Sequence, residues 1–274
     1  MSRIKALLYS IFDNNWSHFL LAMTEKEIRV RYKYALLGFL WIIINPLLQM
    51  AIIGFVFQFF IPVNIDNYFL FLFTGLLPWN FFAMSIQKTT PILVHERSLI
   101  KKSEFPKEVI VFSVILSNLF HLLISLGLLA ILLIVDKLFF QDFSVLETIY
   151  YSIRMLLALP ILIMFSFFVS GLSLFTSALN VKYRDIAFIV SALTPVLFYA
   201  TPVVYTLDLL PESLHLLFYL NPLTFFIEAL RAIFLNTQIT SIPLSMLSLI
   251  TASLIVLIGY RVFKHESPYF DDWI

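Results

Sequence analysis

The chain has 274 residues, of which 61% are hydrophobic and 13% are charged, and its net charge is +1. The charged share is about half that of soluble domains, which excludes an ordinary water-soluble globular protein. The charges lie in loops rather than on one basic face, so nucleic acid is not an expected partner. Without cysteine, disulfides, thiol nucleophiles and cysteine-based metal sites are excluded.

The N-terminal segment, residues 1–34, predicts a cytoplasmic amphipathic helix at the membrane interface. Trp16, Phe19 and Met23 recur at helical spacing and precede a charged run from residue 25 to residue 33. An apolar face followed by a cationic stretch is typical of an interfacial anchor. The alternative is that the basic residues only set the topology. No cleavable signal is expected, because the first long apolar run begins behind this charged segment.

Uncharged runs predict an all-α polytopic membrane domain over residues 35–264. Residues 34–65 contain no Asp, Glu, Lys or Arg, and about 20 apolar residues in a helix suffice to cross a bilayer core. Similar runs follow it. They predict six transmembrane helices at about 36–60, 68–86, 109–135, 155–179, 186–205 and 244–260.

The distribution of Lys and Arg predicts the orientation of these spans. Fifteen of the 18 basic residues lie in the N-terminal segment, the loops 87–108 and 180–185, and the stretch from residue 261 onward. Cytoplasmic loops carry an excess of Lys and Arg. Both termini are therefore expected in the cytoplasm, and residues 265–274 form a cytoplasmic tail.

The loop 87–108 is the best candidate for a docking surface. Pro91 and Pro106 can open and close a helix, and the stretch between them mixes apolar with charged residues. This pattern favours an amphipathic docking helix, and the alternative is a solvated loop that sets topology. The region 207–243 is apolar but broken by three prolines. It predicts two re-entrant half-helices on the periplasmic side, or else a surface loop.

The sequence offers no site for ATP or for ion coupling. The closest two of its six glycines are 16 residues apart, whereas phosphate-binding loops need glycines four or five apart. No catalytic, cofactor-binding or metal-binding residue is predicted. The main spans contain no carboxylate, which ion-coupled carriers generally need, and His121 is interpreted as a packing residue. Active transport would therefore need a separate ATPase chain, and this chain is not expected to be an enzyme.

Five segments, in order along the chain, resemble the membrane subunit of the polysaccharide-exporting ABC transporters, which move O-antigen, capsule or teichoic acid chains. They are the basic run and LG-x-x-W pattern at 28–47, Gly-Leu-Leu-Pro-Trp-Asn at 75–80, Phe-Pro-Lys-Glu at 105–108, Asn-Val-Lys-Tyr-Arg-Asp at 180–185, and Thr-Pro-Val-Val-Tyr at 201–205 with Asn221-Pro222. The resemblance covers nearly the whole chain. It implies a homodimer with two ATPase subunits that bind ATP and Mg²⁺, in a bacterial inner membrane. It also implies a lipid-linked polysaccharide substrate, O-antigen before teichoic acid. The tail after the last span is short, so no carbohydrate-binding domain is expected there.

The resemblance assigns expected roles to three groups of residues. The ATPase-docking residues are Glu25, Arg29, Arg31, His95, Glu96, Arg97 and Lys101; the channel-lining rings are Trp41, Phe55, Phe59, Phe198 and Tyr199; the gate residues are Tyr205, Asn221, Glu228 and Arg231. Two other functions stay open at this point: a stand-alone carrier or channel, and a membrane-embedded enzyme acting on lipid-linked sugars. The membrane-embedded enzyme would have to use the acidic residues and the histidine of the region 207–243 for catalysis.

Overall fold

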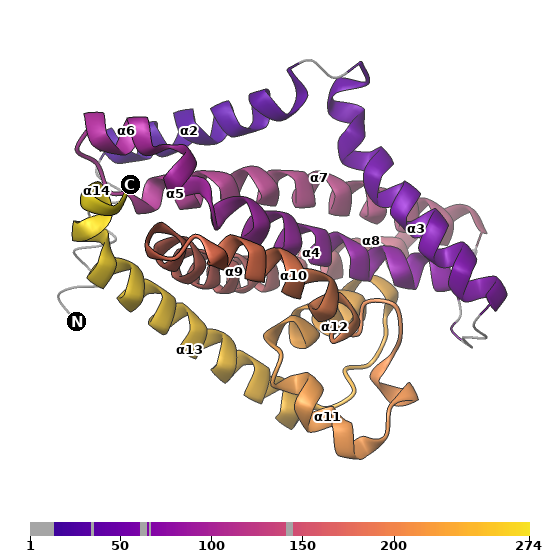
Figure 1. The fold of residues 1–274 in the computed structure, drawn as a ribbon. Coiled ribbons are helices and arrows are strands. Elements are labelled where there is room, and N and C mark those ends of the chain that lie inside the picture. Colours follow the sequence, from indigo (N-terminus) through magenta and orange to yellow (C-terminus); the bar gives the residue numbers. More distant parts are fainter. Residues whose placement is uncertain (1–13, 34–35, 61–64, 66, 141–144) are drawn as a thin grey trace.

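The computed structural model describes residues 14–33, 36–60, 65, 67–140 and 145–274, and these residues form helices and connecting turns without strands (Figure 1). The bounds of the α-helices are α2 Asn14–Tyr32, α3 Trp41–Phe60, α4 Tyr68–Thr89, α5 Ile92–His95, α6 Arg97–Lys102, α7 Glu108–Phe140, α8 Val145–Met155, α9 Ala158–Lys182, α10 Asp185–Tyr199, α11 Glu212–Tyr219, α12 Pro222–Leu235, α13 Ile242–Glu266 and α14 Phe270–Trp273.

Several of these helices can cross a membrane. In the described part of the chain, five helical stretches are long and apolar enough, and they correspond to α3, α4, α7, α9 and α13. The pair α11 and α12 passes the same test together but is bent by 102° between its two halves. The bent pair lies where two half-helices were expected. The chain is therefore an all-α, multi-pass membrane protein.

The predicted fifth span is shorter than expected. The sequence predicts a helix from 186 to 205, but α10 ends at Tyr199, after 15 residues. Pro202 has no N–H to continue the helix, and the backbone carbonyls that follow are taken by distant side chains. Arg231 donates to the carbonyls of Pro202 and Val203, and Tyr68 donates to that of Val204. Tertiary contacts thus hold this part of the chain outside the helix.

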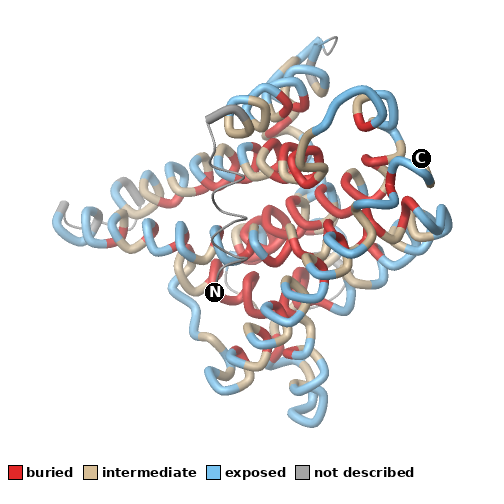
Figure 2. The backbone as a smooth tube through the Cα atoms, turned by 90° about the vertical axis from the view of Figure 1, so that its left-hand side faces the viewer, coloured by how far each residue is buried: buried red, intermediate tan, exposed pale blue. Residues whose placement is uncertain are grey.

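α4 lies at the centre of the bundle. It contacts α3, α7, α9, α10 and α12, and 72% of its most apolar stretch is buried, against 17% for the span that contains α3. Figure 2 shows the buried residues concentrated in the middle of the bundle. A helix that is apolar all round needs apolar surroundings, so the outward face of α3 must meet lipid or another chain.

Phenylalanine rings hold α12 against α4 and α9. Phe165 on α9 stacks on Phe226 of α12 with 4.7 Å between ring centroids, and meets Phe81 of α4 edge-on at 5.3 Å. Such offset and edge-to-face pairs add to the stabilisation from burial. Many of the 30 phenylalanines therefore serve packing.

α9 and α13 approach each other through glycines. A Cβ on Gly259 would lie 2.7 Å from the carbonyl carbon of Gly171, and closer still to the carbonyl oxygen. Only glycine allows backbones this close, and small residues at crossing points are how helices in membranes gain packing contacts. This contact fixes α13, the last long helix, against the core.

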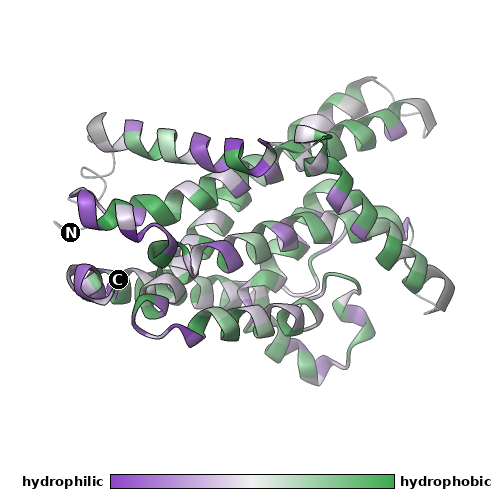
Figure 3. Ribbon diagram, turned by 45° about the horizontal axis from the view of Figure 1, so that its top comes forward, coloured by the Kyte–Doolittle hydropathy of each residue, from purple (hydrophilic) through white to green (hydrophobic). Residues whose placement is uncertain are grey.

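Most of the charged loops meet at one end of the bundle. Figure 3 shows hydrophilic stretches at the end where the C-terminus lies. We call this the basic end; it carries α5, α6, α14 and part of α2. α2 packs along α7, with Met23 and Glu27 buried and Glu25, Lys26 and Arg29 exposed. The predicted amphipathic helix is thus held against the bundle.

Candidate functional site

Residues of the expected docking group form one charged surface at the basic end, made by α2 together with α5 and α6. Lys26 of α2 forms an ion pair with Glu96, with 2.8 Å between Nζ and Oε1. Arg29 donates from Nε to Oε1 of Glu25, one turn earlier, over 2.8 Å. The rings of Phe19 on α2 and Phe105 in the loop also pack edge-on, with 5.1 Å between their centroids. The N-terminal helix and the loop 87–108 are therefore joined into one surface.

The loop 87–108 is amphipathic, as predicted, but its helix is not continuous. The backbone leaves the helical conformation at Glu96, between α5 and α6, with φ −90° and ψ 23°, so the expectation of a single docking helix is wrong. Ile92, Leu93 and Ile100 are buried. Of the expected docking residues in this loop, His95, Arg97 and Lys101 are exposed and Glu96 is half-buried. An anchored apolar side and an outward charged side are what a docking element needs.

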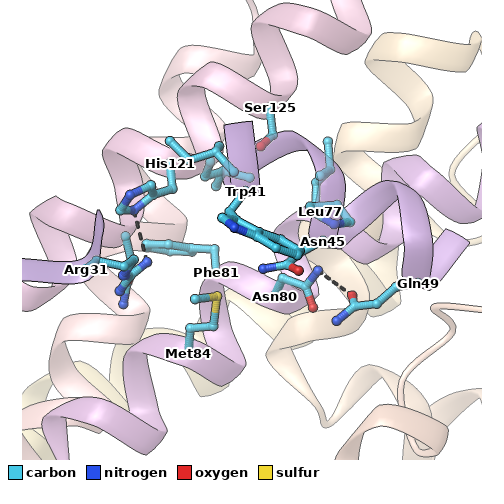
Figure 4. Close-up of a pocket in the computed structure, with 14 residues that line it drawn as sticks. Arg31, Trp41, Asn45, Gln49, Leu77, Asn80, Phe81, Met84, His121 and Ser125 are labelled. Atoms are coloured by element: carbon cyan, nitrogen blue, oxygen red, sulfur yellow. Dashed lines mark hydrogen bonds between the residues drawn. The ribbon is translucent and has the colours of Figure 1, made fainter. Parts of the chain in front are cut away.

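Arg31 lies apart from this surface. Its guanidinium points toward α7, where Nη2 donates to Oδ1 of Asn118 over 2.6 Å and Nη1 lies 3.1 Å from Nδ1 of His121 (Figure 4). A guanidinium can only donate, so His121 accepts at Nδ1. His121, interpreted from sequence as a packing residue, also takes part in this polar contact.

The two side chains line a pocket of about 460 Å³ between α2, α3, α4 and α7. Trp41, expected in the channel, lies in the same pocket, between the Arg31–His121 pair and the amides of Asn80 and Gln49 (Figure 4). Asn80 donates to Gln49 over 2.8 Å. We call this the polar pocket. Its volume is within the range of roughly 300–1,000 Å³ that ligand sites occupy.

The other channel residues have different surroundings. Tyr199 and Phe55 are exposed, whereas Phe198 is half-buried and meets Trp79 edge-on at 5.3 Å. The side chain of Phe59 lies outside the described residues. The structure therefore offers Tyr199 and Phe55 as outward rings, and it turns Phe198 toward the core.

At the opposite end of the bundle, Arg231 joins three elements. It is buried on α12, donates to the carbonyls of Pro202 and Val203, and lies 3.6 Å from the ring centroid of Phe71 on α4. A Cβ at Gly75 would lie 2.9 Å from the Val203 oxygen and would meet the guanidinium. Gly75 is thus the residue that admits Arg231, and the sequence analysis missed it, although it opens the quoted Gly-Leu-Leu-Pro-Trp-Asn segment.

Glu228, the acidic gate residue, is tied to α11 and to the start of α13. Its Oε2 accepts from the hydroxyl of Tyr219 over 2.5 Å, and its Oε1 accepts from Thr240 over 2.8 Å. The backbone N–H of Ser241 in turn donates to the Tyr219 oxygen over 3.2 Å. A buried carboxylate is stable only with such partners, and sequence reasoning missed Tyr219.

Asn221 and Tyr205 form further hydrogen bonds near the end of α10. Asn221 caps α12 by accepting from the N–H of Leu223, and its amide donates to Thr201 over 2.8 Å. The hydroxyl of Tyr205 donates to the carbonyl of Tyr199 over 2.6 Å. Burial raises the pKa of Tyr205 to about 12, so this hydroxyl remains a donor. Tyr205 thus lies in the turn 200–206, and Asn221 and Arg231 bind that turn. Glu228 instead contacts Tyr219 and Thr240.

Most of the chain is similar in sequence to known membrane transporters. The family model of the ABC-2 type transporter matches residues 18–235. Two relatives from Klebsiella pneumoniae, each named O-antigen export system permease protein RfbA, are 33% and 31% identical over 249 residues, which is 89% of this chain and 90% of each relative. A protein of the same name from Myxococcus xanthus is 31% identical over 217 residues, or 78% of this chain and 79% of that protein.

The matched segment runs from the charged surface through the polar pocket to Arg231. It therefore includes most of the helices described above. The chain belongs to the ABC-2 type transporter family, as a multi-pass membrane permease.

Proposed function

We propose that this chain is the membrane subunit of an ATP-driven exporter of lipid-linked polysaccharide. The substrate is of the O-antigen class, the membrane is the bacterial inner membrane, and both termini face the cytoplasm. The single observation that carries the proposal is the identity of 33% over 89% of the chain with an O-antigen export permease. At that coverage the similarity includes both ends of the bundle.

The charged surface supports a separate ATPase as the source of energy. His95, Arg97 and Lys101 project outward while Leu93 and Ile100 beneath them are buried. An exposed charged face on a firmly anchored element can transmit movement from a partner into the bundle, because interfaces of this kind shift as rigid bodies. The chain would receive ATP-driven movement here, with ATP and Mg²⁺ bound by two copies of the partner.

The outward faces of α3 and α10 support a homodimer. Leu48, Ile52 and Phe55 are exposed on α3, as are Leu193 and Tyr199 on α10. Symmetric pairing of two copies would enclose a passage between such faces. Aromatic rings on its wall would contact the apolar faces of sugars weakly, and weak contact lets a long polymer move, since conduction requires binding loose enough to leave.

The network around Arg231 supports a gate at the periplasmic end. It joins the turn after α10 to α12, α4 and, through Glu228, the start of α13. A movement of α10 would therefore carry the bent pair α11 and α12 with it. Such coupled movement would allow the periplasmic gate to open when polysaccharide occupies the passage between the two copies.

The test is surface glycan analysis of a strain from which the gene is deleted. We expect long-chain polysaccharide to disappear from the cell surface and lipid-linked chains to accumulate inside, and we expect the plasmid-borne gene to restore export. A plasmid carrying the gene with its ATPase partner inactivated in the Walker motif is the control for energy coupling. An unchanged surface glycan in the deletion strain would contradict the proposal. If the deletion strain lost surface teichoic acid instead of O-antigen, the chain would still be an exporter subunit, but its substrate would be teichoic acid.

A further inference from the structure

The polar pocket differs from the apolar bundle around it. Asn118 and His121 lie roughly 15–20 Å along α7 from its first residue, at 1.5 Å per residue, so the pocket lies within the bundle and not at its end. Polar side chains converge on it from four helices. They are Arg31 of α2, Asn45 and Gln49 of α3, Asn80 of α4, and Asn118, His121 and Ser125 of α7.

The charge of Arg31 has no carboxylate beside it in the pocket. Among the described residues that line the pocket none is Asp or Glu, and Glu27, one turn earlier on α2, forms its ion pair with Lys88. Asn118 and His121 are neutral acceptors of two guanidinium N–H groups. A guanidinium has five such donors, so donors remain for a ligand. Charged residues at this depth are costly and usually mark a functional site.

The other half of the pocket has the chemistry of a sugar site. Asn80 and Gln49 present amides that can both donate and accept, and Asn45 is exposed beside them. Trp41 lies between these amides and Arg31 (Figure 4). An indole face packs against the C–H face of a pyranose ring, while amides exchange hydrogen bonds with its hydroxyl groups.

We infer that the polar pocket binds a phosphate group together with the sugar attached to it, the group that joins a glycan to its lipid. The inference deepens the proposed function and rests on it. Arg31 pairs with the phosphate, since the planar guanidinium is opposite in charge and can donate two parallel hydrogen bonds to two phosphate oxygens. Trp41 and the amides of Asn80 and Gln49 hold the first sugar. The site therefore recognises the constant end of the substrate.

Two lipids could supply a phosphate here, and the pocket favours one of them. The phosphate of an anionic phospholipid would pair with Arg31, but its glycerol has no sugar ring that could pack against the indole of Trp41. A sugar diphosphate satisfies both halves of the pocket. Trp41 therefore discriminates between the two sources, while Arg31 is needed for either.

The experiment measures binding to the purified full-length chain, with its ATPase partner, in phosphatidylcholine nanodiscs without nucleotide. The probes are citronellyl diphosphate and the same molecule carrying one N-acetylglucosamine, titrated by calorimetry. Phosphatidylglycerol in the nanodisc is the competing lipid. The variants are Arg31→Gln, Arg31→Lys and Trp41→Leu. Arg261→Gln is the matched control, because Arg261 is an exposed arginine on α13 outside the pocket.

We expect Arg31→Gln to weaken both probes by about tenfold to a hundredfold, the value of a charged hydrogen bond. Arg31→Lys should retain part of the affinity, which separates loss of charge from misfolding. Trp41→Leu should weaken only the sugar-bearing probe, and Arg261→Gln neither. Thermal unfolding of each variant checks that it is folded.

Three results would overturn the inference. They are wild-type affinity in Arg31→Gln, an equal effect of Trp41→Leu on both probes, and displacement of the sugar-bearing probe by phosphatidylglycerol, which would make the pocket a phospholipid site. Export by the wild-type gene is measured separately in cells. If the wild type exports but the pocket variants bind normally, only this inference fails. If the wild type does not export, the proposed function fails whatever the pocket binds.

Discussion

Replacing Gly259 with alanine should force α9 and α13 apart. The added Cβ would lie 2.7 Å from the carbonyl carbon of Gly171, whereas ordinary contact begins at 3.4 Å. The backbones must separate by more than 0.7 Å, because the carbonyl oxygen of Gly171 is closer still, and neither backbone can rotate away as a side chain could. Overpacking of this kind costs about 1–3 kcal/mol, and the better helix propensity of alanine returns at most about 1 kcal/mol. The still closer contact with the Gly171 oxygen places the overpacking cost at the upper end of its range, so a net loss of about 2 kcal/mol should result.

The assay is thermal unfolding of the purified full-length protein, followed by tryptophan fluorescence. A loss of about 2 kcal/mol corresponds to a decrease in Tm of about 4–8 °C in a protein of this size, and Gly259→Val should unfold at a lower temperature still. Gly127→Ala is the control, because a Cβ on Gly127 would meet nothing within 4 Å, and its Tm should stay level or rise. The reasoning is refuted if Gly259→Ala unfolds at the wild-type temperature, or if Gly127→Ala is destabilised as much.

Three further predictions concern orientation, coupling and the passage. In a chain without native cysteine, a cysteine at Ser267 should resist an impermeant thiol reagent in intact cells while one at Asn64 reacts; the reverse pattern would invert the topology. Lys26→Glu and Glu96→Lys should each weaken the coupling of ATP hydrolysis to export and the double exchange should restore it, although an exposed pair contributes only about 0–1 kcal/mol; a double variant no better than the single ones would mean that the pair has no role. Tyr199→Ala should slow the export of long chains, measured as surface glycan length, without lowering the amount of assembled complex; degradation of the variant would instead make the ring a packing residue.

The sequence by itself determined the class of the protein, its helices and its charged end. A bilayer imposes length and apolarity on every span, because a backbone in hydrocarbon must satisfy its own hydrogen bonds, and this constraint is local enough to read along the chain. The amphipathic pattern between Pro91 and Pro106 and the proline-broken region 207–243 are local in the same sense. Each corresponds to the helices found there, apart from the break at Glu96.

The tertiary structure alone decided where the polar groups meet. Arg31 and His121 are 90 residues apart, and Gly75 and Arg231 are farther apart still, so no spacing rule could pair them. The two amides of Asn45 and Gln49, one helical turn apart in an otherwise apolar span, were a local signal of a polar face. Their partner across the pocket, Asn80, depended on how α3 packs on α4. In an apolar bundle many packings bury similar area, and contacts between particular side chains select one.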